Sequence, residues 1–145
     1  MSYQGKPGSV HNLGGLIILF YLSDMELMTL LKHLLPSELF EYFNLVDFKE
    51  SSDKTLSFYL DEKNAIPPEL GGLDIVSNGF SKPISIRDFP LRDKTVYLIV
   101  RRHKWKDKQT GKIYTRKWNL TAEGTSYSKE FAAFLKGLHG YLPHK

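Results

Sequence analysis

The cations and aromatic rings in the second half of the chain are the residues best suited to binding chemistry. Eleven Lys and Arg residues lie between Arg87 and Trp118, against three acidic residues. The segment Met25–Asp74 shows the opposite balance, with ten acidic residues and four lysines. A local excess of positive charge favours a polyanionic partner for the basic half. The alternative interpretation is a solvated charged surface that only keeps the protein soluble.

The pattern of this basic region predicts a β-hairpin. Thr95–Trp105 alternates apolar and polar residues, Asp107–Lys112 is typical of a turn, and Ile113–Trp118 returns as the partner strand. A two-stranded ribbon fits the major groove of duplex DNA. Lysine and arginine would neutralise phosphates there, and arginine can also donate two hydrogen bonds to a guanine edge. The candidate DNA-binding residues of the hairpin are Arg101, Arg102, Lys104, Trp105, Lys106, Lys108, Lys112, Arg116 and Lys117.

The aromatic residues of the hairpin allow two interpretations. Tyr97, Trp105, Tyr114 and Trp118 are interleaved with the cations, so their rings could stack on exposed bases. Alternation also places some of them on the core face, where Trp105 and Trp118 would pair across the two strands.

Other kinds of site find little support. The chain has no cysteine, which excludes disulfides, thiol catalysis and cysteine-ligated zinc. The five histidines show no metal-ligand spacing; we place His33 on a helix surface and His103 on the basic strand. No phosphate-binding loop, dinucleotide fingerprint or nucleophile elbow is present. We therefore expect no catalytic residues, no metal, no cofactor and no small-molecule substrate.

The elements that would position the basic hairpin are helices at both ends of a set of strands. Apolar residues recur at helical spacing in Met25–Leu35, in Glu38–Phe43 and in Tyr127–Leu138, which Ser128 would cap. Strands are expected at Leu45–Lys49, at Thr55–Leu60, near Leu73–Ser77 and at Pro83–Pro90. The predicted fold class is α+β: an antiparallel sheet with a basic β-hairpin, two N-terminal helices and a C-terminal amphipathic helix.

The chain is expected to hold one domain, residues 25–140, followed by a tail at 141–145. The apolar run Leu13–Leu22 is shorter than the roughly 20 residues that cross a bilayer, so no membrane partner is expected. The character of the sequence changes abruptly at Met25, and we interpret residues 1–24 as a disordered or non-native leader. The alternative is an N-terminal strand or helix that packs on the core. The lack of cysteine is compatible with a reducing compartment, and we expect a cytoplasmic protein.

Three blocks of the sequence, Met25–Phe43, Ile84–Trp105 and Thr125–Lys136, resemble the N-terminal-region proteins of two-part bacterial insertion-sequence transposases. These belong near the IS-L-three superfamily, in which the corresponding region is a zinc ribbon. The cysteine pairs of that ribbon would fall around residues 70–79 and just after Trp105, and neither place holds a cysteine. The zinc site of the family is therefore not expected in this chain. Packing of Trp105 against Trp118 would take the structural role of the metal.

The resemblance implies that the chain binds transposon-end DNA while a separate polypeptide carries the catalytic core. Arg87, Arg101 and Arg102 match the basic positions of the family, and the lysines of the hairpin would then neutralise the DNA backbone. The alternative is a protein-interaction module that docks onto the catalytic transposase subunit through its acidic helical half or its C-terminal helix. A small enzyme of unknown type is the third hypothesis, and it lacks a visible catalytic set.

Overall fold

The computed structural model describes residues 12–13, 16–17 and 24–139. Two compact units make up the chain, residues 1–41 and residues 42–145. The expected leader, residues 1–24, falls largely outside the described residues, and the expected tail at 141–145 lies wholly outside them.

The first unit contains the helix α1 (Asp24–Leu34), which lies where the helical periodicity predicts it. A two-residue ladder precedes it, with β1 (Asn12–Leu13) antiparallel to β2 (Leu16–Ile17). After Pro36 the helix α2 (Leu39–Tyr42) makes a single turn at the end of the unit. The longer second helix expected over Glu38–Phe43 is cut short because Phe43 begins a strand.

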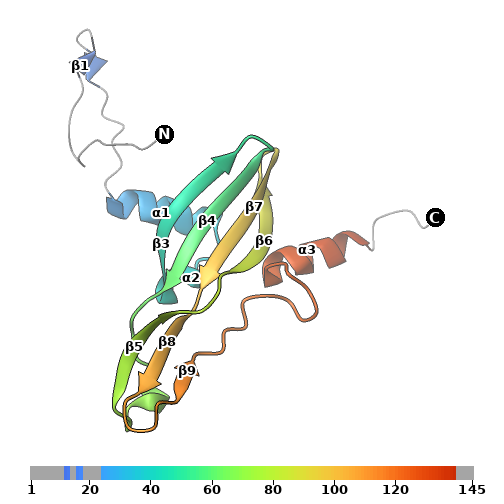
Figure 1. The fold of residues 1–145 in the computed structure, drawn as a ribbon. Helices are drawn as coiled ribbons and strands as arrows, with labels where there is room; N and C mark the ends of the chain where they lie inside the picture. Colours follow the sequence, from blue (N-terminus) through green and yellow to red (C-terminus); the bar gives the residue numbers. More distant parts are fainter. Residues whose placement is uncertain (1–11, 14–15, 18–23, 140–145) are drawn as a thin grey trace. The chain divides into compact units, whose positions relative to one another are not determined.

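The second unit is built on a four-stranded sheet in the order β3–β4–β7–β6 (Figure 1). Its strands are β3 (Phe43–Ser51), β4 (Thr55–Glu62), β6 (Ile84–Leu91) and β7 (Lys94–Arg101). The pairs β3–β4 and β6–β7 are antiparallel hairpins, as the local turn signals predict. The central pair β4–β7 is parallel, so the expectation of an antiparallel sheet is wrong for this pair. A parallel pair needs a long connection, and the chain between β4 and β7 supplies it.

The two faces of this sheet differ sharply in burial. Phe58, Leu98 and Ile86 lie side by side on β4, β7 and β6, and all are nearly inaccessible to solvent. Tyr59, Tyr97 and Ile99 alternate with the buried residues and are only half-buried. The buried face carries the apolar core of the sheet: Leu56, Phe58, Leu60, Ile86, Val96, Leu98 and Val100.

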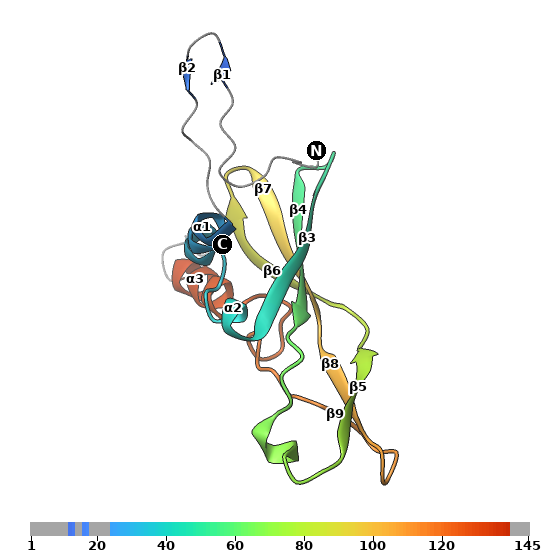
Figure 2. The ribbon, with the colours of Figure 1, turned by 90° about the vertical axis from the view of Figure 1, so that its left-hand side faces the viewer.

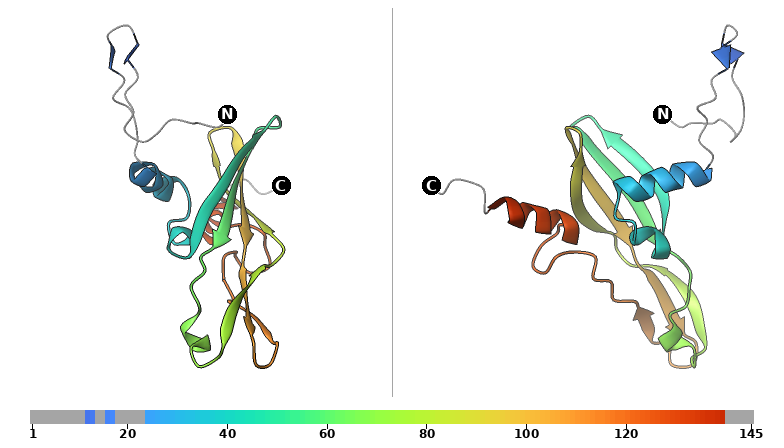
Figure 3. Two further views of the ribbon diagram at one scale, coloured as in Figure 1. Left: turned by 60° about the vertical axis from the view of Figure 1, so that its left-hand side comes forward. Right: turned by 180° about the vertical axis from the view of Figure 1, so that it is seen from behind.

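A three-stranded antiparallel sheet, in the order β5–β8–β9, continues from one end of the first sheet (Figures 1 and 3). Its strands are β5 (Ile75–Phe80), β8 (His103–Asp107) and β9 (Ile113–Thr115). The chain from β4 to β5 includes a short 3₁₀ helix, η1 (Pro68–Leu70), and runs beside this sheet (Figure 2). Leu70 is buried within that segment.

The strands β7 and β8 form one extended run that is interrupted at Arg102. Before the break Val100 is buried, and after it His103 and Trp105 are buried. The single strand expected over Thr95–Trp105 is therefore two strands, in which opposite sets of alternating residues face the interior. An irregularity of one residue is enough to exchange the faces, because side chains alternate with a period of two.

The C-terminal helix α3 (Lys129–His139) packs beside β6. The rings of Phe131 and Phe134 lie 5.1 and 5.3 Å from that of Phe89. This helix matches the amphipathic helix expected from the sequence. None of the helices in the described segments has the length and apolar content needed to cross a lipid bilayer.

Candidate nucleic-acid interface

The basic hairpin expected from the sequence is present as β8, β9 and the turn between them. Trp105 pairs with Tyr114 and Lys106 pairs with Ile113 across the two strands. The turn is held by Asp107, whose carboxylate accepts hydrogen bonds from the Gln109 backbone N–H (3.0 Å) and the Thr110 hydroxyl (3.0 Å). Gly111 takes a φ of 73°, which glycine adopts without steric cost. Residues 103–117 are called the basic ribbon below.

The lysines of the basic ribbon are exposed or half-buried, and those of β8 lie opposite its buried face. Residues that pair directly across antiparallel strands share a face, so Lys106 and Ile113 lie opposite the face of Trp105 and Tyr114. Lys106 is exposed and Lys104 is half-buried. The remaining lysines of the ribbon, Lys108, Lys112 and Lys117, are all exposed.

These five lysines have no carboxylate partner within the described part of the chain. The ion pairs found there join Lys54 to Asp93, Lys94 to Glu50 and Asp93, and Arg101 to Asp61. Lys112 instead has its ammonium group 5.0 Å from the ring centre of Tyr114. The five lysines are therefore not paired with any carboxylate of the described residues and are available to an anion.

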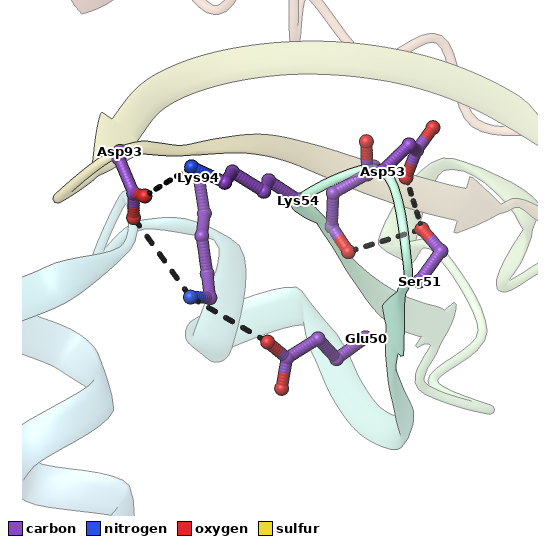
Figure 4. A network of polar contacts seen from close by, with 7 residues as sticks. Glu50, Ser51, Asp53, Lys54, Asp93 and Lys94 are labelled. Atoms are coloured by element: carbon purple, nitrogen blue, oxygen red, sulfur yellow. Dashed lines mark hydrogen bonds and ion pairs between the residues drawn. The ribbon is translucent and has the colours of Figure 1, made fainter.

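The lysines at the β3–β4 and β6–β7 turns have a different environment (Figure 4). Lys54 lies 2.9 Å from Asp93, and Lys94 lies 3.5 Å from Glu50. The hydrogen bond that Lys54 donates lowers the pKa of the Asp93 carboxyl below its ordinary value. Lys54 and Lys94 are thus paired with carboxylates, and they serve as a reference for the unpaired lysines of the ribbon.

Arg101 is not a free cation, although the sequence places it among the DNA contacts. Its Nε and Nη2 donate to the two carboxylate oxygens of Asp61 at 2.7 and 2.6 Å. Its guanidinium also lies 4.5 Å from the ring centre of Phe80. A bidentate pair of this kind holds both side chains in a fixed geometry. Arg101 therefore has a structural role.

The other predicted arginines are dispersed. Arg87 lies on β6 of the four-stranded sheet, with its guanidinium 5.9 Å from the ring centre of Tyr127. Arg102 is half-buried at the break between β7 and β8, and its Nε atom has no hydrogen-bond partner within the described structure. Arg116 lies on the ribbon and stacks 5.1 Å from the ring centre of Trp118. The structure therefore places Arg116 on the same ribbon as the lysines, whereas Arg87 lies on a different sheet.

The prediction for Trp105 is wrong. Its side chain has no exposed surface, so its ring cannot stack on a base. The expected pair of Trp105 with Trp118 is also absent, because β9 ends at Thr115 and Trp118 lies against Tyr42 (4.6 Å) and Phe43 (5.3 Å). Trp105 pairs with Tyr114 instead and forms the buried base of the ribbon.

No family model, no curated protein and no solved structure matches this chain. The resemblance to transposase N-terminal regions therefore stays a prediction. No group of three or more His, Cys, Asp or Glu residues in the described segments is arranged to hold a metal ion.

His103 is the residue that the sequence placed least well. The sequence places it on the basic strand among the cations, and the structure shows that its side chain is buried beneath the ribbon. Its Nε2 lies 2.9 Å from the Ser77 hydroxyl, and its backbone N–H donates to Glu62 Oε2 at 2.8 Å. Burial lowers the pKa of His103 below its ordinary value of 6.5, against the opposing effect of the carboxylates of Glu62 and Asp61. The break at Arg102, which has no sequence signature, moved this residue inside.

Proposed function

We propose that this protein is a DNA-binding accessory region of an insertion-sequence transposase that contacts transposon DNA through its basic ribbon. The observation that carries the proposal is the set of unpaired lysines on one β-hairpin. Cations that are free of carboxylates release counterions from DNA without first breaking an internal ion pair. A two-stranded ribbon also has the width that the major groove accepts.

The structure changes which residues the proposal rests on. Arg101 and Trp105 leave the contact set, because one is paired with Asp61 and the other is buried. Arg87 is set apart on the four-stranded sheet, and Arg102 is half-buried at the break between β7 and β8. The proposed DNA contacts are Lys104, Lys106, Lys108, Lys112, Arg116 and Lys117.

Neutralising the tip of the ribbon tests the proposal. We expect Lys106→Gln with Lys108→Gln to lower the affinity for a labelled 20-base-pair duplex. We also expect a shallower salt dependence, by about 0.9 in the slope of log K against log salt for each phosphate that the ribbon no longer neutralises. Fluorescence anisotropy at several salt concentrations measures both quantities.

The matched control is Lys54→Gln with Lys94→Gln, which removes the same charge at the opposite turns. Surface ion pairs contribute about 0–1 kcal/mol, so this variant stays folded. It should bind the duplex almost as well as the unaltered protein. Equal losses in the two variants would reduce the effect to net charge alone and contradict a contact by the ribbon.

The partners proposed with this function are transposon-end DNA and a separate catalytic polypeptide, in the cytoplasm. Docking onto that polypeptide is the second candidate function. It draws support from α3, where Phe134 and Leu138 are 50% and 40% exposed. If α3 contacts the catalytic polypeptide, Phe134→Ser should weaken co-purification with that polypeptide and leave duplex binding unchanged.

A further inference from the structure

The half-buried face of the four-stranded sheet carries aromatic rings flanked by cations. Tyr59 on β4 and Tyr97 on β7 lie on this face on neighbouring strands. Ser57 is level with Tyr97, and Tyr59 is level with Ile99, so the two tyrosines are diagonal neighbours. The two side chains therefore share one face of the sheet, where each ring can accept another ring.

Among the described residues of the second unit, no helix covers this face. The strands of the sheet lie in front in Figure 1, and α3 lies on the other side of the sheet in Figure 2. Tyr59, Tyr97 and Ile99 keep part of their surface exposed, whereas their neighbours Phe58, Leu98 and Val100 are almost fully buried. The tyrosines are therefore open to a ligand from solvent.

Two cations border the tyrosines. The ammonium group of Lys49 on β3 lies 5.1 Å from the ring centre of Tyr59. Arg87 on β6 is level with Tyr97 in the backbone register, and its guanidinium lies 5.9 Å from the ring centre of Tyr127. Neither forms an ion pair with a carboxylate among the described residues. Of the acids on this face, Asp61 is bound to Arg101. Asp47 pairs with Tyr59 across β3 and β4, and its carboxylate accepts a hydrogen bond from the Phe48 backbone N–H.

Half-buried aromatic rings beside cations that have no carboxylate partner have the chemistry that binds unpaired bases. A base stacks on a tyrosine ring through its flat face, while lysine and arginine neutralise the phosphates on either side. Duplex DNA cannot use such a surface, since its bases are already stacked on one another. If the tyrosines only packed against the sheet, there would be no need for cations without carboxylate partners beside them or for a face that no helix covers.

We propose that this face binds single-stranded nucleic acid, with Tyr59 and Tyr97 stacking on unpaired bases and Lys49 and Arg87 holding the phosphates. The site is separate from the basic ribbon and takes a different form of nucleic acid. It goes beyond the proposed function, and it stands even if the ribbon does not bind duplex DNA.

The full-length Tyr59→Leu, Tyr97→Leu double variant tests the site, with a 20-residue oligothymidylate as the probe. Each ring that stacks on a base should account for about fivefold or more in affinity. We expect the oligothymidylate affinity to fall by that amount per ring while the affinity for a duplex of the same length is unchanged. Tyr114→Leu, the same substitution on the ribbon, is the matched control and should leave oligothymidylate binding intact.

Two outcomes would overturn the inference: an unchanged oligothymidylate affinity in the folded double variant, or equal losses for both probes. The ribbon variant Lys106→Gln, Lys108→Gln separates this result from the proposed function, because it alone should weaken duplex binding. If the double variant does not fold, the unaltered protein is irradiated with oligonucleotide that contains 5-bromodeoxyuridine. Cross-links at Tyr59 or Tyr97 support the site, and cross-links confined to the ribbon overturn it.

Discussion

Individual residues at the base of the ribbon carry several buried polar atoms. The ring of His103 lies between those of Phe80 and Trp105, each 4.9 Å away. Its Nδ1, the Glu62 Oε1 and the Trp105 Nε1 have no hydrogen-bond partner in the described structure. A charged imidazolium in this setting would lack solvation, which explains why burial lowers the pKa of His103.

The stability of the protein should consequently depend on pH through His103. Its folded-state pKa lies below 6.5, so the unfolded chain takes up a proton more readily as the pH falls. The free energy of unfolding should therefore decrease below about pH 6.5, and His103 should contribute no pH dependence well above that value. Urea titrations across this range measure the slope.

His103→Gln provides the comparison, because glutamine does not titrate. The variant should show a smaller decrease in stability below about pH 6.5 than the unaltered protein. Its stability at neutral pH serves as the baseline, since the substitution also changes the packing against Phe80 and Trp105. A slope identical to that of the unaltered protein would show that other groups cause the acid sensitivity.

At the scale of elements, the start of α3 is coupled to the core of the sheet. The Ser128 hydroxyl accepts a hydrogen bond from the Phe131 backbone N–H (3.3 Å) and donates one to Asp88 Oδ1 (2.7 Å). Ser128 and Asp88 are both buried. The predicted N-cap of the helix is thereby confirmed, and it has a second role that the sequence did not indicate. Ser128 thus links the N-terminus of α3 to β6 and supplies a hydrogen bond to the Asp88 carboxylate, which would be unfavourable to bury without a donor.

Ser128→Ala should destabilise the protein by about 2–4 kcal/mol. Loss of an N-cap costs about 1 kcal/mol, and leaving a buried acceptor without its donor costs about 1–3 kcal/mol. Urea denaturation followed by circular dichroism measures the change. Ser126→Ala, an exposed neighbour, should change stability by less than about 0.5 kcal/mol. Similar effects of the two substitutions would refute the capping role.

At the scale of the second unit, the two sheets are joined by more than the continuous chain of β7 and β8. Arg101 binds Asp61 on β4 of one sheet and stacks on Phe80 of β5 in the other. At the same junction the His103 backbone N–H donates to Glu62 on β4. The ribbon is therefore held at its base by side chains from both sheets, which limits its motion relative to the four-stranded sheet.

Arg101→Gln should cost about 1 kcal/mol, because the pair is partly exposed and its ring contact adds little. A double-mutant cycle with Asp61→Asn should show coupling between the two residues. The same substitution should reduce duplex affinity less than Lys106→Gln with Lys108→Gln does. A larger loss of affinity than in the lysine variant would return Arg101 to the DNA contacts and contradict its structural role.

Much of the local structure could be predicted from the sequence. The spacing of apolar residues predicts the helix α1 and the strands of the β3–β4 and β6–β7 hairpins. The conformational preferences of single residues predict the turn at Gly111 and the cap at Ser128. These signals act between near neighbours, so they survive in any fold that the chain adopts. The basic hairpin was visible for the same reason.

The tertiary structure decided which of those residues are available for binding. The parallel pairing of β4 with β7, the burial of Trp105 and the pairing of Arg101 with a carboxylate 40 residues away depend on contacts between distant segments. Local alternation cannot report them, because it shows that a strand has two faces without showing which face is covered. The sequence alone therefore determined the elements and their charge, whereas the packing of the two sheets decided which cations are left free.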